Sequence, residues 1–264
     1  MNSDGHVNIE VESSCLVASG VSDTGHVRTE NEDSIWLDKA GQFMLLCDGM
    51  GGHERGAEAS QTAIKVISEY LDPKLMAEEL QDITGVDGVP SEIACLFSLV
   101  DESIDKASSV LYERNQELNL ERYMGTTVVG LVLIKGEYVL WFHVGDSRLY
   151  RWRDSALEHL TVDHSAHEEW ESNGKIGQEP GKNVITRAIG PNAAVVADIE
   201  WDKWQPNDIY ILCSDGLTDM VTDDQIVEIL KGENKVDDIA KRLVDASNDA
   251  GGKDNTSVVA CMVK

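Results

Sequence analysis

Positively charged residues are scarce in this sequence. Its 22 lysines and arginines face 48 aspartates and glutamates, which gives a formal net charge of −26 at pH 7. A surface of that sign repels the phosphates of nucleic acids and anionic lipids, so we expect neither a nucleic-acid partner nor a membrane partner. The same excess of carboxylates suits small cations.

Long apolar runs and paired cysteines are also missing. The longest run, VVGLVLI at 128–134, is far shorter than the roughly 20 residues that span a bilayer. The first 14 residues lack the basic start and apolar stretch of a signal peptide, and we expect them to form a flexible segment. The five cysteines are odd in number and form no C-x-x-C pair, which is typical of reduced core residues. We therefore predict a cytoplasmic protein.

Motifs of several enzyme classes do not occur. Without G-x-x-x-x-G-K-[ST] there is no cradle for a nucleoside triphosphate, which excludes the common kinase and ATPase sites. Cys47 and Cys213 stand inside strand-like runs and outside any C-x₅-R loop, so we do not predict them as nucleophiles. His164, His167 and Glu168 have helical spacing without the H-E-x-x-H order of zinc sites, and we predict a polar helix there.

What the sequence does contain is a series of short β-rich runs and two pairs of helical patterns, and a block of these runs separates the two pairs. The runs cover 15–21, 34–37, 43–47, 126–134, 138–144, 148–152, 208–213 and 256–263. Helical spacing of apolar residues covers 63–71, 93–111, 223–230 and 236–247, with Thr222 as a cap. Lys135-Gly136 predicts a tight hairpin turn. This order favours an α+β architecture with sheets inside and helix pairs outside.

We expect one domain over residues 15–264. The stretches 72–90 and 165–183 are the longest connections within it. Connections of that length often serve as lids or binding loops.

Carboxylates recur at the ends of the predicted strands. These acids are Asp33, Asp48, Asp146, Asp215 and Asp254. If the strands form one packed pair of sheets, several of these ends converge, and Mg²⁺ and Mn²⁺ prefer oxygen ligands of this kind. Each acid taken singly is more consistent with a turn or a helix cap than with a metal ligand. The set taken together predicts a divalent-cation site.

A series of ordered motifs resembles those of the bacterial metal-dependent protein serine/threonine phosphatases of the PPM family, also called type 2C. The motifs are RTENEDS (28–34), LLCDGMGGHERGAEAS (45–60), GTTVVGLVL (125–133), HVGDSRLY (143–150), LTVDHS (160–165), ITRAIG (185–190), CSDGLTDMVTDDQI (213–226) and GGKDNTSVV (251–259). They run from about residue 15 to the end, and this ordered set is far more specific than any one motif.

The resemblance implies a four-layer α/β/β/α sandwich with two central, mainly antiparallel sheets. It also implies two Mn²⁺ or Mg²⁺ ions at one end of the sheets, with a third ion as an addition. Carried over by motif, Asp48 would bridge the two ions, and Asp146 and Asp215 would form the additional site. The implied metal ligands are Asp48, Gly49 through its carbonyl oxygen, Asp146, Asp215 and Asp254, and Glu32 and Asp33 would orient bound water.

The implied activity is hydrolysis of phosphoserine and phosphothreonine in proteins by a water or hydroxide that bridges the two ions. Asp48, Asp215 and Asp254 would hold that water, and Arg28 would bind the phosphate through its fork of N–H donors. Met50 stands where many relatives carry a histidine, so the proton donor to the leaving group stays open, with His53 as one candidate.

We expect phosphorylated proteins as partners, in particular targets of a Ser/Thr kinase, and a monomer. The stretch 165–183 occupies the place of the family's flap and is expected to help choose the substrate. A non-catalytic phosphoprotein- or cation-binding module on the same fold is the alternative function. A two-metal nuclease shares the chemistry but conflicts with the acidic charge.

Overall fold

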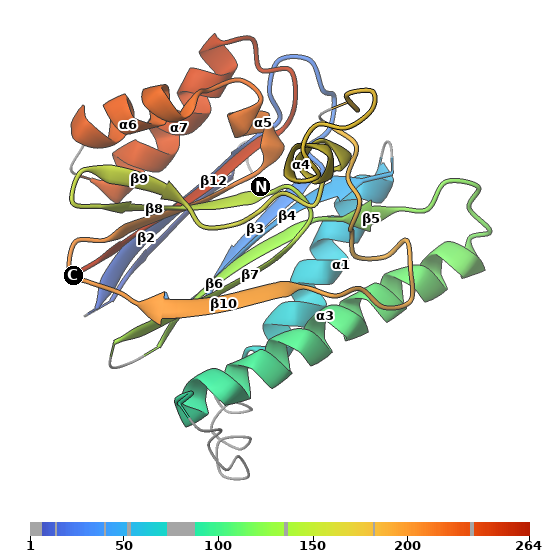
Figure 1. Ribbon diagram of the computed structural model, residues 1–264, viewed down its shortest axis with the longest axis horizontal. Coiled ribbons are helices and arrows are strands. Elements are labelled where there is room, and N and C mark those ends of the chain that lie inside the picture. Colours follow the sequence, from blue (N-terminus) through green and yellow to red (C-terminus); the bar gives the residue numbers. More distant parts are fainter. Residues whose placement is uncertain are drawn as a thin grey trace.

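The computed structural model describes residues 7–13, 15–39, 41–51, 54–72, 88–134, 137–181, 183–232 and 235–264. Two antiparallel β-sheets lie face to face at its centre (Figure 1). The first sheet has the strand order β1 (Val7–Glu12), β2 (Leu16–Asp23), β12 (Thr256–Val263), β11 (Ile209–Cys213), β8 (Arg148–Arg153) and β9 (Ala156–His159). The second has the order β10 (Asp198–Lys203), β7 (Tyr138–Val144), β6 (Val128–Ile134), β4 (Phe43–Met50) and β3 (Asp33–Leu37), and the short β5 (Gly125–Thr126) pairs with β4.

Helices cover the outer face of each sheet. α6 (Asp223–Gly232) and α7 (Val236–Asp249) lie over the first sheet, and α1 (Glu54–Tyr70) and α3 (Ser91–Glu117) lie over the second (Figure 1). Two shorter helices, α4 (Ala166–Ser172) and α5 (Asp215–Thr218), lie near one end of the sheets. The predicted α+β sandwich of four layers is therefore confirmed.

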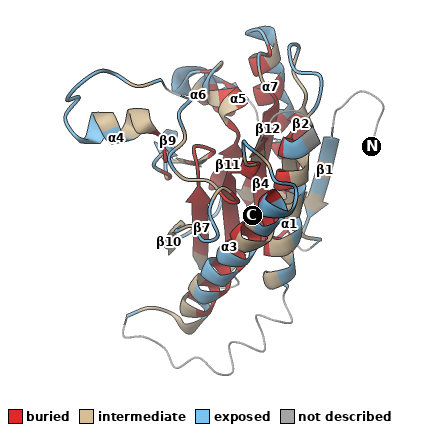
Figure 2. Ribbon diagram, turned by 90° about the vertical axis from the view of Figure 1, so that its right-hand side faces the viewer, coloured by how far each residue is buried: buried red, intermediate tan, exposed pale blue. Residues whose placement is uncertain are grey.

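Three apolar clusters fill the spaces between the four layers. Leu46, Leu131 and Tyr210 belong to the cluster between the two sheets. Ile67 and Ile104 belong to the one under α1 and α3, and a third lies under α6 and α7. The central strands are buried along most of their length while the outer faces of the helices are exposed (Figure 2). Because strands covered on both faces are apolar at successive positions, the runs in the sequence lack a clean alternation.

The helical predictions hold, and the sequence explains where one helix begins. Thr222 precedes α6, and its Oγ1 accepts a hydrogen bond from the backbone N–H of Gln225 at 3.4 Å. The Gln225 Oε1 in turn accepts the Thr222 amide at 2.9 Å, which completes a reciprocal capping box. Asp223 and Asp224 in the first turn complement the helix dipole.

The expectation of a flexible N-terminal segment over 1–14 is wrong for residues 7–12. These residues form β1, which pairs with β2 from Val7 opposite Ser22 to Glu12 opposite Val17. The alternation VNIEVE is a strand pattern with one apolar face, and Ile9 and Val11 pack against the cluster between the sheets. The single-domain boundary at residue 15 therefore cuts a hairpin, and the domain includes β1.

Two predicted connections fall largely outside the described residues. The turn at Lys135-Gly136 is one, although β6 and β7 on either side of it pair antiparallel as expected. Most of the stretch 72–90 is the other. Of the flap at 165–183, all residues but 182 are described, and they include α4.

The sheet order brings one end of many strands to a common edge. β3 begins where β4 ends, with Asp33 directly opposite Asp48. β7 ends at the same edge as β4, because both are antiparallel to β6 between them. In the first sheet, β8 and β12 begin where β11 ends. The acids predicted at strand ends therefore gather at one edge.

Gly130 of β6 shows how tightly the core under α1 and α3 is packed. A Cβ at this position would lie 2.2 Å from Cζ of Phe142, its cross-strand partner. We predict that Gly130→Ala lowers the free energy of unfolding by about 1–3 kcal/mol, because the ring must leave its site. Gly181→Ala is the control, since among the described residues its Cβ would meet Val184 alone, at 3.6 Å. Urea unfolding of both variants tests this, and equal stabilities would contradict it.

Candidate metal centre

Asp48 and Asp33 form the part of the site that comes from the second sheet. Asp48 is held by its backbone: its amide donates to Thr127 Oγ1 at 3.0 Å, and its carbonyl accepts the Thr127 amide at 2.9 Å. Asp33 is buried, and its Oδ2 accepts the Ser214 hydroxyl at 2.9 Å. Its Oδ1 is buried and has no hydrogen-bond partner among the described residues.

Asp215 and Asp254 come from the first sheet. Asp215 follows β11 and opens α5, and Asp254 stands two residues before β12. The Asp215 and Asp48 carboxyls are close enough to share a hydrogen bond. Asp254 Oδ2 accepts a hydrogen bond from Arg28 Nη2 at 2.7 Å, and 48% of the Arg28 side chain is exposed. Arg28 therefore lies at the solvent-facing rim of the carboxylates.

Asp146 stands in the turn between β7 and β8. It is only 7% exposed, and its Oδ1 lacks a hydrogen-bond partner within the described part of the chain. Both Asp146 and Asp215 line a cleft between the flap and α5. A buried carboxylate oxygen without a donor is costly, so an outside group is needed to satisfy it.

The buried carboxyls raise one another's pKa. Burial and then repulsion by Asp33, Asp215 and Asp146 hold the pKa of Asp48 well above its ordinary value. For the same two reasons the pKa of Asp33 rises to about 7, that of Asp146 to about 7 and that of Asp215 to about 6. Repulsion by Asp215 contributes to the raised pKa of Asp33, Asp48 and Asp146, so acids that the sequence placed at separate strand ends do converge.

Glu32 and Gly49 hold the loop beside these acids. Glu32 Oε1 accepts the Gly56 amide at 3.1 Å, and its backbone carbonyl accepts the Gly49 amide at 3.2 Å. A Cβ on Gly49 would lie 2.0 Å from the Gly56 carbonyl oxygen, so only glycine lets these backbones approach so closely.

Asn255 is a site residue that the sequence reasoning missed. Its buried amide accepts the Glu32 N–H at 2.8 Å and donates to the carbonyls of Thr24 and Glu30, each at 2.9 Å. It therefore ties the segment that carries Arg28 and Glu32 to the strand that begins beside Asp254. Its only sequence signal is its place directly after Asp254 in GGKDNTSVV.

The cleft over Asp146 and Asp215 is lined by the flap. Glu168 and Glu171 of α4 face Thr218 and Asp219 across it. Ser165 caps α4 by accepting the Glu168 amide at 3.2 Å. The predicted polar helix is confirmed for His167 and Glu168, but His164 precedes the helix and is buried at 4% exposure. The spacing of His164 from His167 and Glu168 matched a helix because His164 stands only two residues before the first turn of α4.

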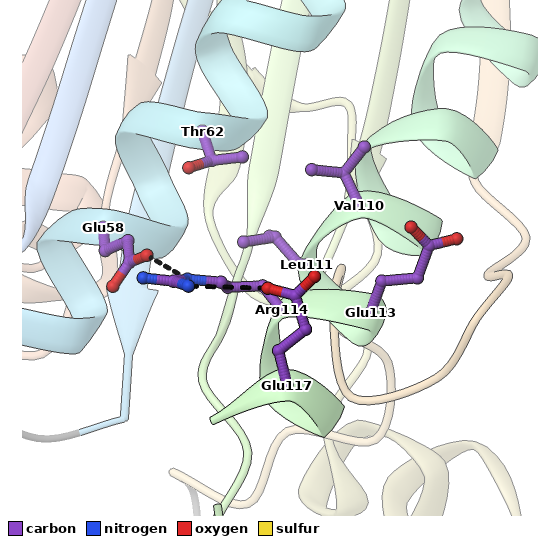
Figure 3. A pocket seen from close by; sticks show the side chains of 7 residues that line it. All are labelled: Glu58, Thr62, Val110, Leu111, Glu113, Arg114 and Glu117. Atoms are coloured by element: carbon purple, nitrogen blue, oxygen red, sulfur yellow. Dashed lines mark hydrogen bonds and ion pairs between the residues drawn. The ribbon is translucent and has the colours of Figure 1, made fainter. Parts of the chain in front are cut away.

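A second hollow lies between α1 and α3 and contains none of the predicted site residues. There Arg114 reaches from α3 to Glu58 of α1, with Nε to Oε1 at 2.9 Å, and also pairs with Glu117 (Figure 3). The exposed ion pair with Glu58 links the two helices across this groove, apart from the predicted site residues.

Two further predictions concern His53 and the cysteines Cys47 and Cys213. His53 lies outside the described residues, so its candidacy as proton donor stays a prediction. Cys47 and Cys213 are buried free thiols whose pKa is raised by burial and by nearby carboxylates, to about 12 for Cys213. Neither thiol is therefore a nucleophile near neutral pH.

The donor set fits hard divalent cations. All the predicted ligands offer oxygen, the buried Oδ1 of Asp146 has no hydrogen-bond partner among the described residues, and neighbouring carboxyls repel one another. A bound cation lowers both the cost of the unpartnered oxygen and the repulsion between the carboxyls.

Comparison with known proteins identifies the family. The family model described as Protein phosphatase 2C matches residues 25–255. The chain belongs to the protein phosphatase 2C family. The serine/threonine phosphatase stp of Listeria welshimeri is 32% identical over 249 residues, which cover 90% of this chain and 92% of that protein.

Two solved structures of relatives have the same fold. The serine/threonine phosphatase PstP/Ppp of Mycobacterium tuberculosis is 29% identical with a TM-score of 0.78, covering 95% of this chain and 99% of that chain. A structure of the PstP catalytic domain in complex with two manganese ions is 32% identical with a TM-score of 0.76, covering 94% and 98%.

This family member is a protein serine/threonine phosphatase, as its motifs predicted, and phosphoproteins are its substrates. The alternative of a non-catalytic binding module is not favoured, because the relatives that match over nearly the whole chain are phosphatases. No helix among the described residues has the length and apolarity to cross a membrane.

The pKa of Asp146 generates a prediction for the phosphatase without metal. Since this pKa is raised to about 7 from 3.8, the folded state is favoured when Asp146 is protonated, and stability is lost as the pH rises through 7. We expect Asp146→Asn in EDTA to be more stable than the parent by about 1–3 kcal/mol at pH 7.5. This advantage should shrink towards pH 5. Urea unfolding at both pH values measures it, with exposed Asp224→Asn as control, and a pH-independent gap would contradict it.

Proposed function

We propose that this phosphatase hydrolyses phosphoserine and phosphothreonine at a centre of two Mn²⁺ or Mg²⁺ ions, with a third as an addition. Asp48, Asp215 and Asp254 are the proposed carboxylate ligands, and Gly49 contributes its carbonyl oxygen. Asp146 and Asp215 are proposed to hold the additional ion. The observation that carries this assignment is the convergence of buried carboxyls with raised pKa values and unpartnered oxygens.

The ions, when bound, supply an activated water near neutral pH and offset the negative charge of the phosphate. The chain's own residues set the arrangement. Asp33 and Glu32 are proposed to orient water, since Asp33 keeps one buried oxygen without a partner in the described chain. Ser214 and the Gly56 amide hold these two acids in place.

Arg28 is proposed to bind the phosphoryl group of the substrate. A guanidinium has five N–H donors in a planar fork, and within the described residues one hydrogen bond, from Nη2 to Asp254, is made. The half-exposed position leaves the remaining donors accessible to an anion that enters from solvent. Asp254 would thus link the phosphate grip to the metal centre.

The identity of the metal is inferred from a relative and from the donor atoms. One structure of PstP is a complex with two manganese ions, and the oxygen donors of this chain suit manganese and magnesium equally. We propose manganese or magnesium for this protein on that basis.

We further propose a cytoplasmic monomer that acts on targets of a Ser/Thr kinase. Cys47, Cys213 and Cys261 are buried free thiols, which is typical of a reducing compartment. The flap of residues 165–183 is proposed to help select the phosphoprotein, because α4 lines the cleft beside Asp146. Phosphoproteomics in cells that carry either the parent or Asp48→Asn would identify the substrates.

The metal requirement is tested with a phosphothreonine peptide. We expect the protein to release phosphate with Mn²⁺ and to lose this activity in EDTA. Asp215→Asn should lower kcat/KM by at least about 100-fold, because this residue is a proposed ligand both of the two-ion centre and of the additional ion. Asp224→Asn at the exposed start of α6 is the matched control and should keep parental activity. Full activity in EDTA would overturn the proposal.

The role of Arg28 is tested by Arg28→Lys. Lysine keeps the charge but cannot bind two phosphoryl oxygens with a planar fork, so we expect kcat/KM to fall about 10- to 100-fold. Arg114→Lys is the matched control, since Arg114 pairs with Glu58 and Glu117 in the groove of Figure 3. Steady-state kinetics on the same peptide decide the matter, and parental kinetics for Arg28→Lys would refute the assignment.

A further inference from the structure

A second buried polar cluster lies beside the carboxylates and is not used by the proposed mechanism. His143, His164 and Asp198 bring one nitrogen or oxygen each within 4.8 Å of one another. Both histidines are 4% exposed, and their rings stack with centroids 4.4 Å apart. Such a group can serve either as a metal site or as a hydrogen-bond device.

The hydrogen bonds of His164 argue against a metal. The Gly145 amide donates to His164 Nδ1 at 3.1 Å, so Nδ1 must carry a lone pair and the proton lies on Nε2. Nε2–H then donates to Asp198 Oδ2 at 3.2 Å. A metal on Nε2 would move the proton to Nδ1, where it would face the Gly145 N–H. Both ring atoms are thus committed to hydrogen bonds.

The other members of the cluster are committed as well. His143 Nε2 lies 2.9 Å from the Val162 carbonyl, to which it donates. Asp198 Oδ1 accepts Arg187 Nη1 at 2.7 Å. Burial lowers the pKa of both histidines, to about 4 for His164, so the neutral forms that these bonds require are present near neutral pH.

The backbone of His164 joins three segments. Its amide donates to the Gly145 carbonyl at 2.9 Å, and its carbonyl accepts the Thr186 amide at 2.8 Å. The next residues pair in the same way, with Ala166 N donating to Val184 O at 2.8 Å. Both ends of the flap therefore meet at His164, and its main chain and ring together hold both polar groups of Gly145.

We propose that His164 is a positioning residue that holds the Gly145–Asp146 turn, and hence the Asp146 carboxylate, in place for its cation. Gly145 directly precedes Asp146, whose Oδ1 is buried without a partner among the described residues. The same side chain anchors this turn to Asp198, the first residue of β10, which in turn accepts a hydrogen bond from Arg187. The proposal rests on the proposed ligand role of Asp146.

A pair of substitutions separates the two bonds of the ring. In His164→Asn the amide oxygen takes the place of Nδ1 and can still accept the Gly145 N–H, but the bond to Asp198 is lost. In His164→Gln the amide nitrogen takes the place of Nε2 and can still donate to Asp198, but no acceptor faces Gly145. His159→Gln is the control, because His159 bonds Thr161 and stacks on Tyr150 instead.

Two measurements on the full chain test the proposal. By calorimetric titration with Mn²⁺ alone, we expect His164→Gln to weaken the weakest cation site about tenfold, while His164→Asn and His159→Gln stay within about threefold of the parent. By NMR hydrogen exchange in EDTA, the Gly145 amide should exchange at least about tenfold faster in His164→Gln than in His164→Asn.

Equal exchange and equal Mn²⁺ affinity in the two His164 variants would overturn the positioning role. The positioning role would also be overturned if His164→Asn showed the weaker Mn²⁺ binding and the faster Gly145 exchange. The bond to Asp198, rather than the bond to Gly145, would then support the site. The exchange measurement needs neither metal nor substrate. A parent without phosphatase activity would therefore refute the proposed function and leave the exchange comparison to decide the role of His164.

Discussion

The mutual repulsion of carboxyls buried at one end of two sheets is the constraint on which the rest of this structure depends. Burial and repulsion act in the same direction on Asp33, Asp48, Asp146 and Asp215, and they raise the pKa of each. A fold cannot keep such a set together for packing alone, because each ionised acid costs free energy. The cost is offset when cations bind, and this destabilised end of the sandwich is the proposed site of the reaction.

Antiparallel topology is what gathers these acids. Strands that alternate in direction place the end of one beside the beginning of the next, and Asp33 stands directly opposite Asp48 for that reason. A frame of neutral hydrogen bonds surrounds these acids: Thr127 fixes the backbone of Asp48, Ser214 fixes the carboxyl of Asp33, and Asn255 fixes the segment before Glu32. The frame adds no charge, so it orients the acids without relieving their repulsion.

Sequence reasoning anticipated the layers, most strands, the four long helices and the carboxylate ligands of the proposed site, because apolar periodicity and ordered motifs are local signals. It failed where partners are distant in sequence. β1 was taken for a flexible segment although VNIEVE alternates, since a strand so short becomes stable only by pairing with β2. The motifs that contain Asn255 and His164 did not predict the roles of these two residues, because the roles consist of bonds to Glu32, Gly145 and Asp198.

The amino-acid sequence alone specified which residues are proposed to carry the chemistry, through an ordered set of Asp-Gly, Gly-Asp and Asp-Asn motifs with one arginine that resembles the motifs of one phosphatase family. It also specified the acidic charge and the α+β class. Tertiary structure alone decided how those residues share their environment: which carboxyls raise one another's pKa, which oxygens are left without a donor, and how the flap is tied to Asp146 through His164. The physical reason is that repulsion, burial and hydrogen bonding depend on distances through space, and these distances exist only once the two sheets have packed.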